Sequence, residues 1–272
     1  MKTRKVAITG IDGCGKSTLI QELMNRCSDH GNLYQAFSCT NYHDTPNAPF
    51  SALSRAFDQL SQFADARNDS KLKYAALYLK MSLFGPIEQF FLNQFSPQFL
   101  ITERQALVAS LVYGQFYAQV NRNKDENEGV KSLWTPELLN DDNFHWKEIL
   151  HWFELENIRL DRKLDLWQLP EYLMEVQANE PMTLLKILEK MFRTSLPEKI
   201  IYLQIDEEIA ANRVGLGKTK EIHESQQHLK QLHLYYQKVL GLVGKAGVQT
   251  IVLPVGSKTP EAICLEVIHI LN

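Results

Sequence analysis

The chain has 272 residues, of which 44% are hydrophobic, and its formal net charge is −3. This length suits one large α/β domain or a core domain with an insertion, and the charge excludes a global basic field that would recruit nucleic acid or a membrane. No apolar run approaches the length of a membrane span, and the run after the basic first residues is too short for a signal peptide. The cysteines have no metal or redox spacing and predict free thiols in a reducing cytoplasm: Cys14, Cys27, Cys39 and Cys264.

The N-terminus predicts a strand, a loop and a helix in succession. Residues 6–9 are an apolar run typical of a buried strand, and apolar residues at helical spacing extend from Leu19 to Cys27. The nine residues between them fit the phosphate-binding pattern G-x-x-x-x-G-K-[ST]. They are Gly10, Ile11, Asp12, Gly13, Cys14, Gly15, Lys16, Ser17 and Thr18. The flanking strand and helix argue against a chance match in a loop.

This phosphate loop predicts that the chain binds a nucleoside triphosphate. Its glycines let successive backbone N–H groups turn inward around a phosphate, and the helix N-terminus adds partial positive charge. Lys16 is expected to reach the β- and γ-phosphates, and the Ser17 hydroxyl to ligate Mg²⁺. We therefore expect ATP and Mg²⁺ as cofactors.

Four further apolar runs predict strands, at residues 33–39, 99–102, 200–205 and 248–253. Residues 40–50 are polar and rich in turn formers, at the strand end where ligands of open α/β sheets bind. A mostly helical pattern covers 51–94, and a last helix begins with Thr259 as N-cap and Pro260 at its first position. The alternation predicts an α/β fold, a three-layer αβα arrangement around a five-stranded parallel sheet.

The connection between the third and fourth predicted strands, residues 105–199, far exceeds the roughly 10–12 residues that one crossover needs. It contains a charged run at 121–128 and then helical periodicity. It also holds all four tryptophans: Trp134, Trp146, Trp152 and Trp167. We predict a helical insertion at about 116–195 with its own small hydrophobic centre. The alternative is that these aromatic residues serve only core packing.

Two segments look like other nucleotide-binding motifs but lack their context. Residues 123–126 are similar to the guanine-reading N-K-x-D pattern, but Glu126 holds the last position and the run does not end a strand. A GTPase is therefore not expected. Residues 215–219 look like a second phosphate loop, but Asn212 stands at its first glycine position and a helix precedes it.

The order of the remaining motifs resembles the thymidylate kinase family of P-loop kinases. In that family an acidic residue lies two positions after the first loop glycine, as Asp12 does here. The family has Asp-Arg at the position of Glu103-Arg104, and the related deoxynucleoside kinases have Glu-Arg there. Residues 206–213 are similar to the helix that leads into the family's mobile lid, and residues 254–260 to a loop near the adenine.

This resemblance covers roughly residues 1–115 and 196–272 and leaves the predicted insertion unmatched. It implies one P-loop kinase domain over residues 1–272, with a lid at about 213–225. By resemblance, Asp12 would contact the ribose hydroxyl of the acceptor, or would only brace the loop.

Phosphoryl transfer needs alignment of donor and acceptor and positive charge around the moving phosphate. Arg104 follows a predicted strand beside the first one and is expected to neutralise phosphate, the alternative being a surface arginine. Glu103 is expected to bind Mg²⁺ through water or to orient the acceptor, the alternative being a structural carboxylate. We assign Arg213 and Lys218 of the lid to the catalytic set, and Arg213 also to the nucleotide site. A solvated run of charge is the alternative for the lid.

The acceptor side departs from the family. Residues 38–44 stand where the family has its Arg-Glu-Pro-Gly signature. The family also has an arginine on the helix before the third strand, and the corresponding residues 75–82 contain none, although Lys80 lies close to that position. A buried monophosphate needs paired positive charge, so these losses argue against thymidine monophosphate as acceptor.

Three functions follow. We favour an ATP-dependent kinase of a nucleotide, nucleoside or similar small acceptor. A thymidylate kinase proper would need Lys80 and insertion residues to replace the lost arginines. A protein that uses ATP as a switch would dock a partner on the insertion. The presence of Lys16, Ser17, Glu103 and Arg104 together favours chemistry over a switch. Whether the chain forms a homodimer stays open.

Overall fold

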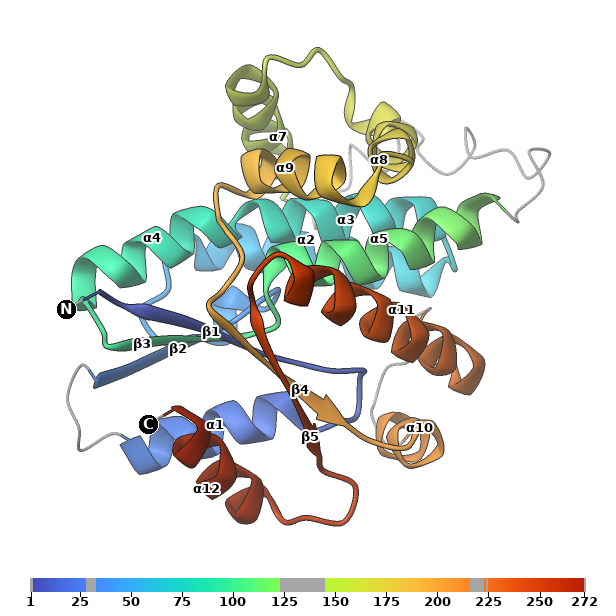
Figure 1. The fold of residues 1–272 in the computed structure, drawn as a ribbon. Helices are drawn as coiled ribbons and strands as arrows, with labels where there is room; N and C mark the ends of the chain where they lie inside the picture. The colour runs from blue at the N-terminus through green and yellow to red at the C-terminus, as the bar shows by residue number, and fades with distance from the viewer. Residues whose placement is uncertain (1, 28–32, 123–144, 216–222, 224, 272) are drawn as a thin grey trace.

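A five-stranded parallel sheet lies at the centre of the computed structural model (Figure 1). Its order is β2-β3-β1-β4-β5, so the first strand lies between the third and fourth. The strands are β1 (Arg4–Thr9), β2 (Tyr34–Ser38), β3 (Phe99–Glu103), β4 (Lys199–Gln204) and β5 (Gln249–Pro254). All five strands were predicted from apolar runs, and each prediction is confirmed to within two residues at either end.

Helices cover both faces of the sheet, which confirms the predicted three-layer arrangement (Figure 1). On one face lie α1 (Lys16–Cys27) and α12 (Pro260–Leu271), which contact each other. On the other face lie α4 (Phe84–Phe95), α5 (Ala106–Arg122) and α11 (Gln226–Lys245). Beside them, α2 (Ser51–Ala66) and α3 (Ser70–Ser82) pack together, α3 also packs on α5, and α10 (Glu207–Gly215) packs on α11.

Local capping explains where several of these helices begin. The Asp69 carboxylate accepts hydrogen bonds from the backbone N–H groups of Lys71 and Leu72 and so caps α3. Thr259 Oγ1 accepts from the N–H of Ala262 at 3.3 Å, with Pro260 as the first residue of α12. The last helix therefore starts as the sequence predicted.

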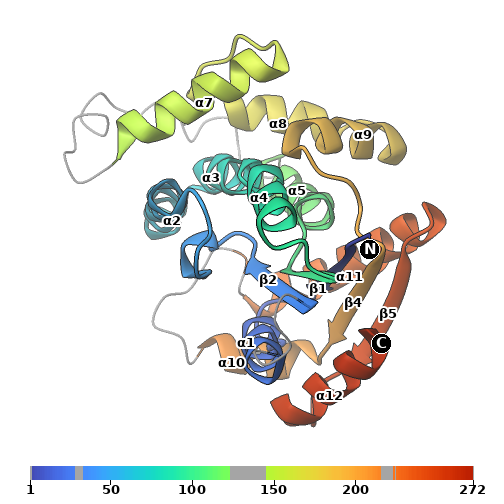
Figure 2. The same cartoon turned by 90° about the vertical axis from the view of Figure 1, so that its left-hand side faces the viewer.

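The predicted insertion forms a further helical layer over α3 and α5, on the side away from the sheet (Figure 2). It comprises α7 (Trp146–Leu160), α8 (Leu169–Gln177) and α9 (Pro181–Phe192). The prediction that this layer has its own hydrophobic centre is wrong, because its buried side chains belong to the same continuous cluster as the core. A hydrogen bond also ties this layer to the core, because Trp152 Nε1 donates to Ser82 Oγ of α3 at 2.7 Å. The assigned extent of about 116–195 stays a prediction, as do the limits of the domain and lid.

The structure describes residues 2–27, 33–122, 145–215, 223 and 225–271. The segment 123–126, Trp134 and the lid residue Lys218 lie outside these ranges. Within the described ranges, no helix combines the length and apolar character that crossing a membrane requires.

Candidate functional site

A cavity of about 890 Å³ opens at the carboxyl ends of the strands. It is lined by the phosphate loop, by the ends of β2 and β3, and by residues of α10 and α12. Ile8 pairs with Glu103 in the sheet, so the loop after β1 and the end of β3 reach the same edge. This is the position where ligands of open α/β sheets bind.

The phosphate loop has a backbone that depends on its glycines. Gly13 has φ +83°, and a Cβ there would lie 2.5 Å from the backbone oxygen of Ala210 in α10. Gly15 also has a positive φ, +91°. Residues with a Cβ rarely adopt such positive φ values, so only glycine takes up this loop conformation without backbone strain.

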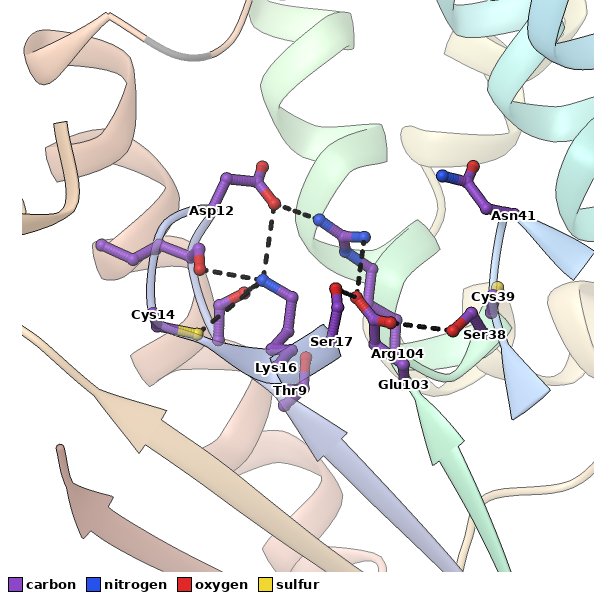
Figure 3. Close-up of polar contacts among 12 residues, drawn as sticks. Thr9, Asp12, Cys14, Lys16, Ser17, Ser38, Cys39, Asn41, Glu103 and Arg104 are labelled. Atoms are coloured by element: carbon purple, nitrogen blue, oxygen red, sulfur yellow. Dashed lines mark hydrogen bonds and ion pairs between the residues drawn. The ribbon is translucent and has the colours of Figure 1, made fainter. Parts of the chain in front are cut away.

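Lys16 is buried within this loop (Figure 3). Its Nζ donates to the carbonyl oxygens of Gly10 at 3.0 Å and Ile11 at 2.9 Å, and lies 3.4 Å from Asp12 Oδ1. Burial by itself would lower the pKa of Lys16, but nearby Cys14 and Asp12 outweigh it and raise that pKa. Lys16 is therefore a protonated cation positioned inside the loop.

Glu103 joins the phosphate loop to β2 (Figure 3). Ser17 Oγ donates to Glu103 Oε1 at 2.8 Å, and Ser38 Oγ donates to Oε2 at 2.9 Å. Oxygen ligands of this kind suit Mg²⁺, which takes one or two protein groups together with phosphates and water. Among the described residues no group of three or more His, Cys, Asp or Glu side chains could hold a metal ion. Ser17 and Glu103 thus offer two oxygen groups that fit a nucleotide-bound Mg²⁺.

Asp12 is the centre of the charged network. Its carboxylate forms an ion pair with Arg104, accepts from Tyr113 Oη at 3.0 Å, and lies 3.0 Å from His223 Nε2. Burial opposes ionisation of Asp12, but Arg104, Lys16 and His223 together hold its pKa well below the usual range. Asp12 is therefore a carboxylate shared between the loop and its neighbours.

Sequence reasoning missed two members of this network, Tyr113 and His223. Tyr113 lies on α5, about two helical turns after its first residue Ala106, and its ring meets that of His223 edge-on with the centroids 5.2 Å apart. No local pattern in the sequence singles out Tyr113. His223 falls inside the predicted lid, but no local pattern distinguishes it.

Two arginines contact the phosphate loop, Arg104 at Asp12 and Arg213 at Gly13. Arg104 has φ +59°, uncommon for a residue other than glycine, and its backbone N–H donates to Ile8 O at 2.8 Å. Burial alone would lower its pKa, but the Asp12 carboxylate outweighs burial and raises it well above the usual value. Arg213, on α10, is exposed and donates to the carbonyl oxygens of Gly13 at 3.3 Å and Gly256 at 3.4 Å. The roles predicted for these residues stay predictions; the structure brings them to one site.

A second cavity of about 90 Å³ adjoins the first, and Thr40, Asn41 and Arg104 line both. Its polar lining also includes residues of the α2–α3 pair, of α5, and His223: Asp58, Ser61, Lys73, Lys80, Tyr113, Tyr117 and His223. Lys80, which is close in sequence to the position of the family's arginine, therefore lies beside the site. We call this space the acceptor-side cavity, because Lys80 is expected from the sequence on the acceptor side.

The chain has the fold of known nucleotide and nucleoside kinases. No family profile matches the sequence, and no curated protein sequence matches it significantly. Among solved structures, a thymidylate kinase from Candida albicans superposes with TM-score 0.55 at 15% identity, covering 99% of this chain and 91% of that one. A deoxyadenosine kinase from M. mycoides with bound dATP gives TM-score 0.50 at 15% identity, covering 98% and 99%. The same kinase with bound dCTP gives 0.52 at 13% identity, covering 98% of both chains. The P-loop kinase fold, with thymidylate kinase-like neighbours, is thereby established.

Proposed function

We propose that this protein is an ATP-dependent phosphotransferase that moves the γ-phosphate of ATP to a nucleotide, nucleoside or similar small acceptor. One observation carries the proposal. The phosphate loop and the end of β3 are joined by two direct links, Asp12 with Arg104 and Ser17 with Glu103. The groups that would hold a donor phosphate and the cation that would face an acceptor thus lie in one connected site.

Each group has a role that follows from its position. The loop N–H groups, Lys16 and the N-terminus of α1 would hold the ATP phosphates. Ser17 and Glu103 would hold Mg²⁺, which supplies charge neutralisation when it is bound. Arg104 and Arg213 both contact the phosphate loop, so they would stabilise the negative charge of the transferred group. The kinases with similar folds, which act on or bind nucleotides, support this class of reaction.

Two other functions stay available, with less support. A thymidylate kinase proper would use Lys80 in place of an arginine, but that lysine is paired with Asp58 at 2.5 Å. A switch protein would dock a partner on the helical layer, where Ile158 is 71% exposed and Leu155 44%. The switch does not account for the links between Asp12 and Arg104 and between Ser17 and Glu103 as directly as phosphotransfer does.

An ADP-release assay tests the proposal. We expect ATP with Mg²⁺ to raise the melting temperature, and at least one compound in a panel of nucleosides, monophosphates and small alcohols to stimulate ADP release. Failure of ATP and Mg²⁺ to raise the melting temperature would overturn the donor site. Stabilisation by ATP with no acceptor-dependent ADP release across the panel would favour the switch.

A further inference from the structure

The three cations that line the acceptor-side cavity all have carboxylate partners. Lys73 forms an ion pair with Asp65, Lys80 lies 2.5 Å from Asp58, and Arg104 pairs with Asp12. The lysine side chains are only 4% and 7% exposed, so solvent screens these pairs weakly. The charges of both lysines are therefore already balanced by a neighbouring aspartate, while Arg104 shares Asp12 with Lys16 and His223.

The helical hairpin of α2 and α3 explains this arrangement. The two aspartates are seven residues apart on α2, and the two lysines are seven residues apart on α3. Seven residues are about two helical turns, so both pairs lie on the same side of the hairpin. The fold itself thus sets lysine against aspartate at the cavity wall.

A phosphorylated acceptor is poorly matched to such a wall. A phosphate dianion that entered would compete with Asp58 and Asp12 for the lysine and arginine, and the carboxylates would repel it at short range. The donor side differs, because the two shortest contacts of Lys16 Nζ are backbone carbonyl oxygens, at 3.0 and 2.9 Å. A neutral carbonyl can give up a lysine to a phosphate without leaving a buried charge unpaired.

An uncharged acceptor fits the same groups. Hydroxyl and amide groups of a ligand can bond to the Asp58 carboxylate, the Ser61 hydroxyl and the Asn41 amide, while Leu77 and Met81 offer apolar surface. The cavity of about 90 Å³ is small, so it would hold one ring or short chain of the ligand. The remainder of the ligand would extend past Arg104 into the larger cavity.

We propose that the acceptor is an uncharged, hydroxyl-bearing molecule of nucleoside type, and that the carboxylate-paired lysines select against phosphorylated acceptors. This rests on the proposed phosphotransfer. The acceptor hydroxyl oxygen forms a bond to the γ-phosphorus, and the bond from that phosphorus to the β,γ-bridging oxygen breaks. ADP leaves with the electron pair, the hydroxyl proton is released to solvent, and the products are ADP and the acceptor monophosphate.

Matched acceptor pairs test this selection in the unmodified protein. Each common nucleoside is compared with its own 5′-monophosphate by ADP release, and we expect the best nucleoside to exceed its monophosphate at least 100-fold in kcat/KM. Binding of each pair is also measured by thermal shift in the presence of Mg²⁺ and a non-hydrolysable ATP analogue. Equal or better use or binding of the monophosphates overturns the inference. ADP release with neither class would instead contradict the proposed phosphotransfer, and the binding comparison would still decide the charge of the ligand.

The variant Asp58→Asn tests the cause of the selection, because it frees Lys80 from its carboxylate. We expect the kcat/KM ratio of monophosphate to nucleoside to rise at least tenfold, while the exposed control Asp161→Asn leaves the ratio unchanged. An unchanged ratio in a folded Asp58→Asn protein would show that the ion pair of Lys80 with Asp58 does not cause the selection. Circular dichroism checks folding, and the matched pairs on the unmodified protein decide the inference if the variant does not fold.

Discussion

The phosphate loop and the acceptor-side cavity solve the problem of buried charge in different ways. The loop surrounds Lys16 mainly with its own carbonyl groups, and all of these lie within six residues of the lysine. The cavity instead pairs its lysines with aspartates on a neighbouring helix, 8 and 22 residues away in sequence. The contacts of Lys16 are local and can be exchanged for a ligand phosphate. The lysines of the acceptor-side cavity depend on tertiary packing, and their charges are already neutralised by the aspartates.

The largest expected effect comes from Lys16→Ala, which removes the cation of the loop. ADP release should fall at least about 100-fold, the usual loss when one group that stabilises transition-state charge is removed. The fold should persist, because the loop backbone and the pairing of Asp12 with Arg104 remain. The exposed control Lys245→Ala should leave activity unchanged. Near-normal activity of folded Lys16→Ala would show that the loop is not the donor site.

Asp12→Asn tests the residue shared by the two halves. It leaves Arg104, Lys16 and His223 around a neutral side chain, and breaking buried ion pairs in this way costs about 3 kcal/mol of unfolding free energy. Because the folded-state pKa of Asp12 lies well below its unfolded value of about 3.9, the carboxylate stabilises the fold above that pH. This contribution is lost as pH falls through the folded pKa.

Urea unfolding at pH 7 and at pH 3 measures both expectations for Asp12→Asn. The stability gap between the unmodified protein and the variant should be largest at neutral pH and should narrow in acid. A stability gap that stays the same at both pH values would mean that the charge of Asp12 contributes nothing to stability. Asp12 would then stabilise the fold only through its hydrogen bonds and packing.

The same contrast explains what could be predicted from sequence. The strands, and the strand–loop–helix order around Gly10, are encoded by consecutive residues such as the apolar run before Gly10, and those predictions are confirmed. Tyr113 and His223 reach Asp12 from 101 and 211 residues away, a proximity that only the fold creates. The separate hydrophobic centre was wrongly predicted because helical periodicity shows that a face is apolar, but not which surface covers it. The seven-residue spacing of the cavity ion pairs was visible in the sequence and was overlooked.

The final prediction concerns the ion pair of Lys73 and Asp65, which joins α3 to α2 at the cavity wall. Either Lys73→Met or Asp65→Leu should lower the free energy of unfolding by about 3 kcal/mol, because each leaves an opposite charge buried. The double variant should lose much less than the sum, since apolar groups can replace a whole pair.

A double-mutant cycle in urea measures the coupling between the two residues, expected at about 1–3 kcal/mol. Binding of ATP with Mg²⁺ should be unchanged in the double variant, because neither residue lines the larger cavity. Additive losses would show that the two charges do not stabilise each other, and weakened ATP binding would show that the two halves of the site are not independent. Coupled stability with intact donor binding would instead show that this ion pair holds the α2–α3 hairpin together independently of the phosphate loop.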